Sequence, residues 1–446
     1  MRLRLVLPRG RGRAGLGSLR RLLRLAAPAL LAAVVFAGCG APPAARRGVS
    51  AKSPAPLGPA FGLTENNANL LWPPATTVSP SDGPRVQSAR ERLTALHPRY
   101  LRLLVNWAAL QPAPDRPPSL EGPVDGCART VAPRAAYAGM RARLQAIAAQ
   151  QRIARAQGRA GFEVVLDLFG APAWAARGPG GCELGATRPF SRPLSAAGIA
   201  GYRALIRSLL ALGAREGVAL SWWAPWNEPN DAVFVSPQRA SCAADAPSLA
   251  PAVYTQLAQA MADELHAAGG VHRLLLGELN GFATDSPHRT SVSSFVADLP
   301  ESVVCLSDVW SVHAYAAYAA ARASEAEHEP EELEAALDAR GTCGRRASIW
   351  ITEAGVGAPH PGRPRPQGAQ VQRAGCQALA AQLRRWAGDP RVRAVFQYSF
   401  REDPAFPVGL LSADLAHVYP AYGLWLSYTR ESARGEQLST PPGLCA

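Results

Sequence analysis

The chain has 446 residues, of which 48% are hydrophobic and 18% are charged, a composition typical of a globular protein with a large core. Its formal net charge of +13 is concentrated at one end, because eight arginines lie within the first 24 residues and no acidic residue precedes position 39. Without these arginines the net charge is +5, and a modestly basic chain with few aromatic residues gives no reason to expect nucleic-acid binding.

The first 38 residues have the pattern of a signal peptide. The arginine-rich start is followed by an apolar run at 25–37 and by small residues before position 39, which is the usual order of basic region, hydrophobic region and cleavage point. A membrane-spanning anchor is the alternative, but the apolar run is short and no stop-transfer pattern follows it. Both the general secretion pathway and the twin-arginine pathway are compatible with this segment. Either pathway predicts export from a bacterial cell.

The four residues Phe36-Ala37-Gly38-Cys39 resemble a bacterial lipobox. The resemblance implies that Cys39 carries lipid and that the mature protein is tethered to a membrane surface rather than spanning it. Residues 39–59 are rich in Ala, Pro, Gly and Ser, which predicts a flexible spacer. We therefore expect one folded domain over 60–446, monomeric, on the outer face of the cytoplasmic membrane or outside the cell.

From residue 60 onward, short apolar runs alternate with amphipathic runs of helical period, as in parallel βα units. We predict strands at about 60–63, 100–106, 162–169, 219–226, 272–278, 307–313, 348–353 and 393–400. We predict helices at about 84–96, 134–157, 195–215, 250–268, 289–298, 329–340, 368–387 and 419–428. Eight such units predict an α/β fold with a single (β/α)8 TIM barrel. An open doubly wound sheet is the alternative, but 61–66 lack its usual glycine-rich phosphate turn.

The predicted loops after the second, third and fourth strands are long, and such loops lie on the substrate-binding face of a barrel. Seven cysteines follow Cys39, and none has the CxxC spacing of a zinc site. The barrel layout places Cys305 and Cys343 before adjacent strands at the amino-terminal face. It places Cys127, Cys182 and Cys242 in three successive loops at the opposite face, where an exported protein could pair two of them.

Two predicted strands end on a glutamate. One ends in Trp226-Asn227-Glu228-Pro229-Asn230, and the other ends on Glu353. Strict alternation cannot turn both Asn227 and Glu228 inward, so we expect the first strand to twist or bulge at its end. On the second strand, Ile349 and Ile351 share a side with Glu353. If these isoleucines fill the barrel, Glu353 points into the pocket, and Trp350 and Thr352 face the helices.

Two strand-tip carboxyl groups suit the hydrolysis of a glycosidic bond. Carboxyl groups about 5–5.5 Å apart act as a nucleophile and an acid/base with retention of configuration. An ionised Glu353 would favour the protonated form of Glu228 through charge repulsion, which suits Glu228 as the acid. This chemistry needs no metal and no cofactor, and we expect neither.

The segment from Trp226 to Asn230 matches the Asn-Glu-Pro signature of clan A glycoside hydrolases, retaining (β/α)8 enzymes that include cellulase-like and β-xylosidase-like families. The resemblance implies that Glu228 is the acid/base and that Asn227 hydrogen-bonds the sugar 2-hydroxyl. Thr352-Glu353-Ala354-Gly355 resembles the clan's nucleophile context. The resemblance covers nearly all of 60–430 and implies a β-linked polysaccharide or oligosaccharide substrate.

Other strand ends resemble the same clan. Arg102 resembles the arginine that orients the nucleophile, and His313 and Tyr315 resemble a His/Tyr pair whose spacing puts both side chains on one side of the strand. Many members carry a tryptophan as a sugar platform at the end of the last strand. This chain has Tyr398 and Phe400 there, so either of these or a loop residue is expected to serve.

Further residues qualify as substrate contacts by position alone. Trp107 and Trp174 follow the second and third strands, where aromatic faces can stack on sugars. Glu65 and Glu278 end two other strands and are candidates for sugar subsites. Two rival functions stay open: a non-catalytic carbohydrate-binding or scaffolding lipoprotein, which the presence of both strand-tip glutamates disfavours, and a transglycosylase. The sugar, the linkage and endo or exo action are open as well.

Overall fold

The computed structural model describes residues 58–65, 83–121, 139–185, 187–243, 245–316, 329–356, 365–403, 406–434 and 443–445. The predicted signal peptide at 1–38, Cys39, nearly all of the spacer and Cys127 lie outside these ranges. Within the described ranges, no helix combines the length and the apolar character that crossing a membrane requires.

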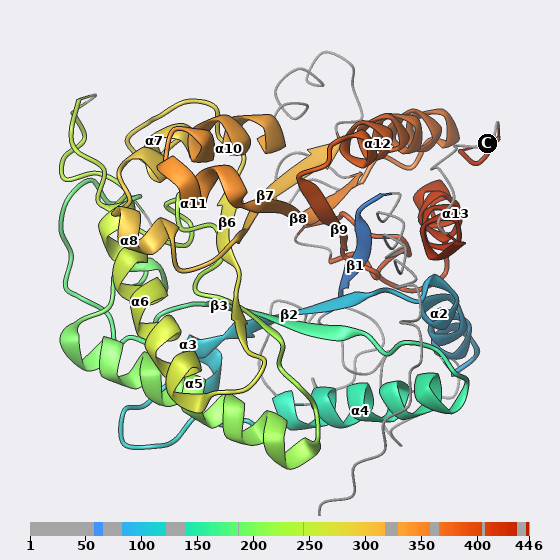
Figure 1. The fold of residues 1–446 in the computed structure, drawn as a ribbon, viewed down its shortest axis with the longest axis horizontal. Coiled ribbons are helices and arrows are strands. Elements are labelled where there is room, and N and C mark those ends of the chain that lie inside the picture. The colour runs from blue at the N-terminus through green and yellow to red at the C-terminus, as the bar shows by residue number, and fades with distance from the viewer. Residues whose placement is uncertain are drawn as a thin grey trace, which may run out of the picture. The chain divides into compact units, whose positions relative to one another are not determined.

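Nine parallel strands form a nearly closed barrel (Figure 1). They are β1 (Ala60–Thr64), β2 (Tyr100–Asn106), β3 (Glu163–Phe169), β4 (Trp222–Ala224), β5 (Arg273–Leu274), β6 (Leu276–Asn280), β7 (Val309–Ala316), β8 (Ser348–Val356) and β9 (Val392–Tyr398). Their order is β5-β4-β3-β2-β1-β9-β8-β7-β6. β5 and β6 are two parts of one barrel strand that is interrupted at Leu275, so the ring has the eight positions predicted from the sequence.

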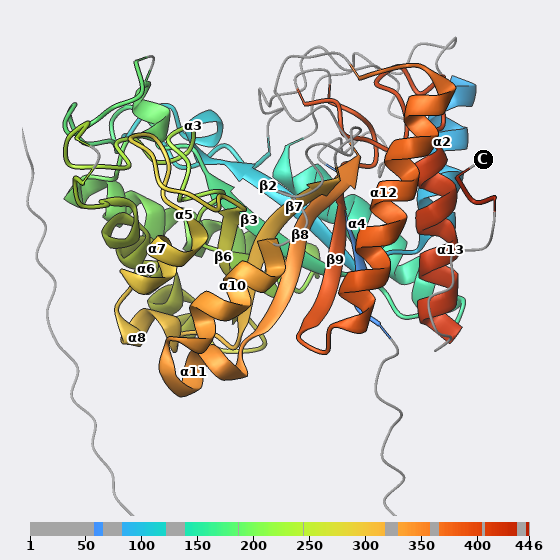
Figure 2. The same cartoon turned by 90° about the horizontal axis from the view of Figure 1, so that it is seen from above.

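Helices surround the strands (Figures 1 and 2). The long ones are α2 (Gly83–Leu96), α4 (Met140–Ala156), α5 (Ala196–Glu216), α6 (Ala250–Ala268), α10 (Glu329–Asp338), α12 (Ala369–Gly388) and α13 (Pro420–Arg434). The short ones are α3 (Trp107–Leu110), η1 (Pro189–Ser191), α7 (Val292–Ala297), α8 (Glu301–Val304) and α11 (Gly341–Arg346). The predicted α/β barrel and its eight main helices are confirmed, whereas α3, η1, α8 and α11 were not predicted.

Helix α5 shows how local sequence sets the boundaries of these elements. Its first turn is capped by Ser195, whose side chain accepts a hydrogen bond from the backbone N–H of Gly198, as a serine at this position typically does. It ends at Gly217, which has a φ of 67°, a left-handed conformation that glycine adopts without steric cost. Its buried face, which includes Leu205 and Leu209, packs toward the barrel.

The barrel interior is filled by a compact apolar cluster contributed by strands and by Leu275. The ring of Trp350 packs in a tilted arrangement against Tyr100 and Trp222, at a centroid distance of 4.5 Å in each case. Phe396 packs against both Tyr100 and Trp350. The remaining members are Val165, Ala224, Leu275, Val309 and Ala394. These side chains form a solid core, so the barrel is not a channel.

This core corrects the predicted faces of β8. Trp350 points into the barrel, whereas Ile349 and Ile351 belong to the larger apolar cluster between strands and helices. The prediction assumed unbroken alternation up to Glu353. The structure instead has a bulge: Ile351 pairs with Val312 and Glu353 pairs with His313, so one extra residue stands on β8. The bulge lets Thr352 and Glu353 both turn inward.

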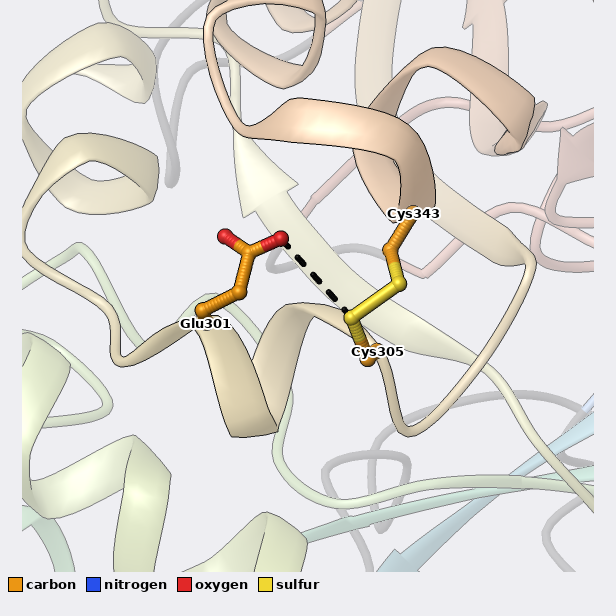
Figure 3. Close-up of side chains that lie close together, drawn as sticks. All are labelled: Glu301, Cys305 and Cys343. Carbon is orange, nitrogen blue, oxygen red and sulfur yellow. Dashed lines mark hydrogen bonds between the residues drawn. A yellow bond between two sulfur atoms is a disulfide. The ribbon is translucent and has the colours of Figure 1, made fainter.

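One disulfide joins the two short helices at the amino-terminal end of the barrel. Cys305 follows α8 and Cys343 lies in α11, and both helices lie below the strands in Figure 2. Glu301 lies beside this bond, with its carboxylate 3.8 Å from the sulfur of Cys305 (Figure 3). The predicted location of this cysteine pair, before two adjacent strands, is confirmed.

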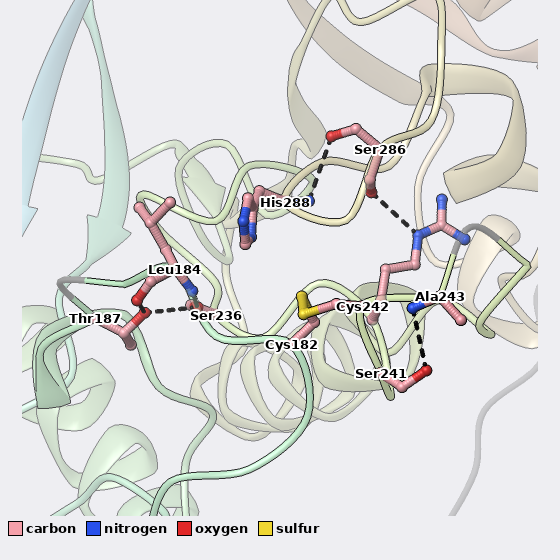
Figure 4. The surroundings of a disulfide bond; sticks show 10 residues. Cys182, Leu184, Thr187, Ser236, Ser241, Cys242, Ala243, Ser286 and His288 are labelled. Atoms are coloured by element: carbon pink, nitrogen blue, oxygen red, sulfur yellow. Dashed lines mark hydrogen bonds between the residues drawn. A yellow bond between two sulfur atoms is a disulfide. The ribbon is translucent and has the colours of Figure 1, made fainter.

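A second disulfide joins the loop after β3 to the loop after β4. Cys182 and Cys242 are bonded (Figure 4). The backbone N–H of Cys182 donates to the carbonyl of Arg239 at 2.9 Å. Thr187 and Ser236 connect the same two loops by a 2.9 Å hydrogen bond between their hydroxyls. The expected pairing within the upper loops is therefore present. A third disulfide, Cys376–Cys445, was not predicted.

Candidate active site

Arg102 is the centre of the polar layer that lies above the apolar core. It points inward from β2, two residues beyond Tyr100, and its side chain is fully buried. Its Nη1 donates to Oε1 of Glu353 at 2.7 Å, and its Nη2 lies 2.7 Å from Asp167 and 2.7 Å from Glu278. A buried guanidinium needs such partners because an unpaired buried charge is very costly.

The tip of β4 carries the predicted Asn-Glu pair. Oδ1 of Asn227 accepts a 3.0 Å hydrogen bond from Arg102, and Nδ2 of Asn227 has no hydrogen-bond partner among the described residues. The next residue, Glu228, has a φ of 38°, and its backbone N–H donates to the carbonyl of Glu278 at 2.9 Å. The predicted break in alternation is confirmed, because the strand ends at Ala224 and the chain bends before both side chains turn inward.

The tip of β8 brings Glu353 opposite Glu228. One carboxylate oxygen of Glu228 lies within 4.8 Å of one carboxylate oxygen of Glu353. The side chains are 13% and 8% exposed, respectively, so both reach the edge of the buried layer. Two carboxyl groups at this spacing are close enough to act on the same small group.

His313 and Tyr315 on β7 contact the two glutamates. Nδ1 of His313 lies 2.7 Å from Glu228 and 3.7 Å from Glu353, and its Nε2 lies 2.8 Å from Glu278. The hydroxyl of Tyr315 donates a short hydrogen bond to Oε2 of Glu353. The two side chains point to the same side of the strand, as their spacing predicted.

The buried groups have strongly shifted proton affinities. Burial lowers the pKa of His313, but the charge of Glu353 and the hydrogen bonds to Glu228 and Glu278 outweigh burial and raise that pKa to about 10. Burial raises the pKa of Glu278, yet Arg102 and His313 bring it down to about 2. For Asp167, burial dominates over Arg102 and raises the pKa well above its usual range. Near neutral pH we therefore expect a charged His313 and an ionised Glu278.

One more acid lies beside this layer. Asp231 follows the β4 tip, and its backbone N–H donates to the carbonyl of Glu228 at 3.0 Å. Burial, and next the charge of Glu228, raises the pKa of Asp231 to about 7. Its charge therefore changes near neutral pH, close to the site.

Two clusters of the described residues have metal-ligating atoms close together. One is Glu228, His313 and Glu353. A protonated imidazole offers no lone pair to a metal, and both ring nitrogens of His313 face carboxylates. The other contains Cys305 and Cys343, whose sulfurs are joined in a disulfide (Figure 3) and are not thiolates. The first cluster is better described as a network of shared protons.

Two of the aromatic residues proposed as sugar contacts are unavailable for that role. Trp107 is fully buried, with its ring against Trp174 and Tyr202, so it has no free face for a sugar. Phe400 is fully buried as well. Trp174 is partly exposed, but its indole N–H donates to the carbonyl of Gln111 at 3.0 Å. We therefore remove Trp107 and Phe400 from the candidate site.

Tyr398 is partly exposed at the end of β9 and belongs to an aromatic group near Glu353. Phe406, from the loop after β9, contacts the rings of both Tyr398 and Tyr315, at centroid distances of 5.6 Å and 5.3 Å. Tyr315 in turn contacts Glu353. Of the candidates at the last strand, Tyr398 is the one whose surroundings suit a sugar platform, and Phe406 supports it.

The two remaining candidates are buried. Glu65 is 3% exposed and accepts a hydrogen bond from the backbone N–H of Arg401, which is a structural role. Glu278 is 0% exposed and lies beneath the glutamate pair. Sequence reasoning also missed Asp167, whose signal was an acid in the middle of the apolar run that follows Glu163 in β3. A charged residue in that setting needs a buried partner, which here is Arg102.

No protein-family model matches this sequence, and no curated protein matches it. SrfJ from Salmonella typhimurium is 10% identical with a TM-score of 0.51, and the match covers 83% of this chain and 74% of that chain. A conserved exported protein from Bacteroides fragilis is 14% identical with a TM-score of 0.50, covering 79% of this chain and 72% of that chain. These two likenesses agree with the barrel fold described above.

Exo-β-1,4-mannosidase Op5Man5 from Opitutaceae bacterium strain TAV5 is 16% identical with a TM-score of 0.48. That match covers 86% of this chain and 61% of the mannosidase, so this chain spans less than two thirds of its length. Sequence identities this low are evidence for the fold alone. Because one barrel fold supports many activities, the function has to be argued from the site.

Proposed function

We propose that this protein is a retaining glycoside hydrolase that cleaves β-linked glycans or glycosides by double displacement. The observation that carries the proposal is the glutamate pair, because a carboxylate oxygen of Glu228 lies within 4.8 Å of one of Glu353. Retaining enzymes hold their two carboxyl groups about 5–5.5 Å apart, whereas inverting enzymes need about 6.5–9.5 Å for an intervening water. The pair on these strand tips fits the retaining arrangement.

Glu353 is the proposed nucleophile. Arg102 donates to one of its oxygens and Tyr315 to the other, and these two bonds fix the orientation of the carboxylate. In the first step a Glu353 oxygen bonds to the anomeric carbon, the glycosidic C–O bond breaks, and the leaving oxygen takes a proton from Glu228. In the second step Glu228 takes a proton from water, whose oxygen displaces Glu353 from the sugar.

The buried layer next to the pair contains charges of both signs. Arg102 and a protonated His313 carry two positive charges, and Glu278 carries one negative charge. One ionised and one protonated glutamate is the state in which the first step begins. His313 contacts Oε1 of Glu228, which leaves Oε2 for the proton that is transferred.

The proposed substrate is a β-linked polysaccharide or oligosaccharide. Asn227 is held by Arg102 through its oxygen, so its amide nitrogen is oriented for the sugar 2-hydroxyl. Tyr398 and Trp174 are the proposed aromatic contacts for sugar rings.

We propose further that the protein acts outside the bacterial cytoplasm. Residues 1–38 would be removed as a signal peptide, lipid on Cys39 would hold the chain at a membrane surface, 39–59 would act as a spacer, and 60–446 would be a monomeric catalytic domain. Three disulfides support an oxidising location, because such bonds persist there and are rare in the cytosol.

The test is a hydrolysis screen over β-glucans, mannans, xylans, galactans and aryl β-glycosides. On any substrate that is cleaved, proton NMR of the first product formed reports its anomeric configuration, and we expect retention. Inversion would exclude the covalent intermediate on Glu353. Transfer of the sugar to an added acceptor, in place of water, would identify a transglycosylase, and binding to a glycan without any cleavage would identify a carbohydrate-binding protein.

A further inference from the structure

Glu278 is a buried acid that the proposed mechanism does not use. It lies on β6, its side chain is fully buried, and its backbone has a φ of 53°, a conformation that non-glycine residues seldom adopt. Its backbone is fixed on both sides, because its N–H donates to the hydroxyl of Ser311 at 2.8 Å and its carbonyl accepts from the N–H of Glu228 at 2.9 Å. A fully buried, strained acid is retained only when its surroundings stabilise it.

One oxygen of Glu278 collects three hydrogen bonds. Its Oε2 accepts from Nη2 of Arg102 at 2.7 Å, lies 2.8 Å from Nε2 of His313, and accepts from the hydroxyl of Thr352 at 3.1 Å. The three donors come from β2, β7 and β8. Such a carboxylate fixes the orientation of three side chains on three strands at once.

Two of these donors reach the proposed catalytic pair. Arg102 also donates to Glu353 at 2.7 Å, and His313 also contacts Glu228 at 2.7 Å. We propose that Glu278 is a positioning residue that fixes Arg102 and His313 through one buried oxygen and thereby couples the nucleophile to the acid/base. The inference rests on the proposed function for its catalytic meaning, and Glu278 itself touches no substrate.

The charge of Glu278 has a second effect, on the proton of His313. With the ionised Glu278 on one side and an oxygen of Glu228 on the other, a charged His313 donates from both ring nitrogens, and the two bonds fix the orientation of the ring. The titratable groups that act on His313 come from five places in the fold: Asp167 (β3), Glu228 (the β4 tip), Glu278 (β6), Glu353 (β8) and Glu329 (α10). Arg102 (β2) shares the Glu278 oxygen with His313. Of these, Glu228 and Glu278 hydrogen-bond the ring directly.

The direct test is the titration of His313, followed by nitrogen-15 NMR of histidine side chains and assigned by the signal that disappears in His313→Gln. We expect His313 in the unaltered protein to stay protonated well above pH 8, because its pKa lies at about 10. In Glu278→Gln, which keeps the size and loses the charge, the midpoint should fall by at least about one pH unit. The control is Glu301→Gln, an exposed glutamate on α8, which should leave the midpoint unchanged.

Kinetics then test the positioning of the pair. We expect Glu278→Gln to lower kcat about 10- to 100-fold, as loss of a hydrogen bond to a charged group does, and to move the alkaline limb of the kcat/KM–pH profile to lower pH. Glu278→Asp retains the charge and should leave that limb within a few tenths of a pH unit of its original place. An alkaline limb that does not move in Glu278→Gln would overturn the coupling.

The outcomes separate the two proposals. If His313 is neutral at pH 7 in the unaltered protein, or if its midpoint is the same in Glu278→Gln, the role of Glu278 is wrong even where glycosides are cleaved. If the protein cleaves no glycoside but the midpoint falls as expected, the proposed function fails while the coupling of Glu278 to His313 stands. If Glu278→Gln does not fold, Thr352→Val takes its place, because it removes one donor to the same Glu278 oxygen. The His313 titration is then compared between the unaltered protein and Thr352→Val, and this comparison tests the role of Glu278.

Discussion

The inside of this barrel has two levels built on the same strands, and the levels differ in polarity and charge. The lower level is aromatic, with Tyr100, Trp350 and Phe396 in mutual contact. The upper level is charged, and on two strands it starts only two residues later, at Arg102 and Thr352. Because inward-facing residues alternate along a strand, a single step of two residues takes the chain from the core to the site.

The difference shows how such a fold supports a buried charged site. The apolar level supplies burial and rigid walls, since aromatic rings lose little conformational freedom when they pack. The charged level is costly to bury and is retained because its members pair with one another. Stability and catalysis should therefore respond differently when each level is altered.

The largest effect is expected from Glu353→Gln, at the charged level. The amide keeps the size and loses the nucleophile, so turnover should fall at least about 10⁴-fold, while the unfolding midpoint in urea changes little. The matched control is Glu301→Gln at the opposite face. Turnover near that of the unaltered protein would remove Glu353 as the nucleophile.

Glu228→Ala should produce a loss that depends on the substrate. A glycoside with a poor leaving group needs the proton, so its rate should fall about 10²- to 10⁴-fold, whereas an aryl glycoside with an acidic phenol should lose far less in its first step. Burst kinetics with the activated glycoside would separate the two steps. An equal loss across leaving groups would contradict the acid role.

At the apolar level, Trp350→Ala should lower stability strongly and leave the catalytic preference unchanged, the opposite of what is expected for Glu353→Gln. Removing the indole from a solid core should cost about 3–5 kcal/mol of unfolding free energy, measured by urea denaturation, while the folded fraction keeps the substrate preference of the unaltered protein. Ile351→Val, on the helix-facing side of the same strand, should cost only about 0.5–1.5 kcal/mol. Similar costs for the two variants would contradict the interior placement of Trp350.

Thr352→Val tests the boundary between the two levels. The substitution keeps the shape and removes the hydroxyl that donates to Glu278, which should cost about 1.5–3 kcal/mol, because the bond is made to a charged group. Thr352→Ser keeps the hydroxyl and should cost less. A value for Thr352→Val within error of zero would place Thr352 outside the charged network.

The last prediction concerns the pH dependence of stability. The pKa of Glu278 is lowered from 4.5 to about 2, so its contribution is present above pH 4.5 and is lost as the pH falls toward 2. The pKa of His313 is raised from 6.5 to about 10, so its contribution is complete below pH 6.5 and is lost as the pH rises through 10. The urea concentration at the unfolding midpoint should therefore be highest between pH 4.5 and pH 6.5. In Glu278→Gln, this midpoint should fall less steeply as the pH is lowered below 4.5.

Most of the fold could be predicted because each βα unit has a recognisable pattern in its own stretch of sequence. Apolar runs and helical stripes gave all eight barrel positions and the main helices, and the broken alternation at Asn227 and Glu228 was visible in the sequence. The faces of β8 could not be predicted, because the bulge at Thr352 arises from its pairing with β7 and β9. A bulge of this kind depends on two other strands, and no local pattern contains it.

The site was predictable where a motif marks a strand tip. Glu228, Glu353 and their four partners Asn227, Arg102, His313 and Tyr315 were singled out from the sequence, and the structure brings all six together. The linking role of Glu278 was not predictable, since an acid at a strand end is equally compatible with a solvent-facing subsite. Aromatic contacts were the weakest, because burial decides whether a ring such as that of Trp107 has a free face, and burial depends on distant loops.

The interruption of the barrel at Leu275 has a consequence for heat inactivation. Among the residues that the structure describes, β5 pairs with β4 alone and β6 pairs with β7 alone, so the strand pairing is interrupted between β4 and β6. We call this interruption the seam. Glu228 lies on one side of this seam and Glu278 on the other, joined by a backbone hydrogen bond. Warming should open the seam before the rest of the ring. Activity should then be lost at a temperature at which the helices and most strands are still intact.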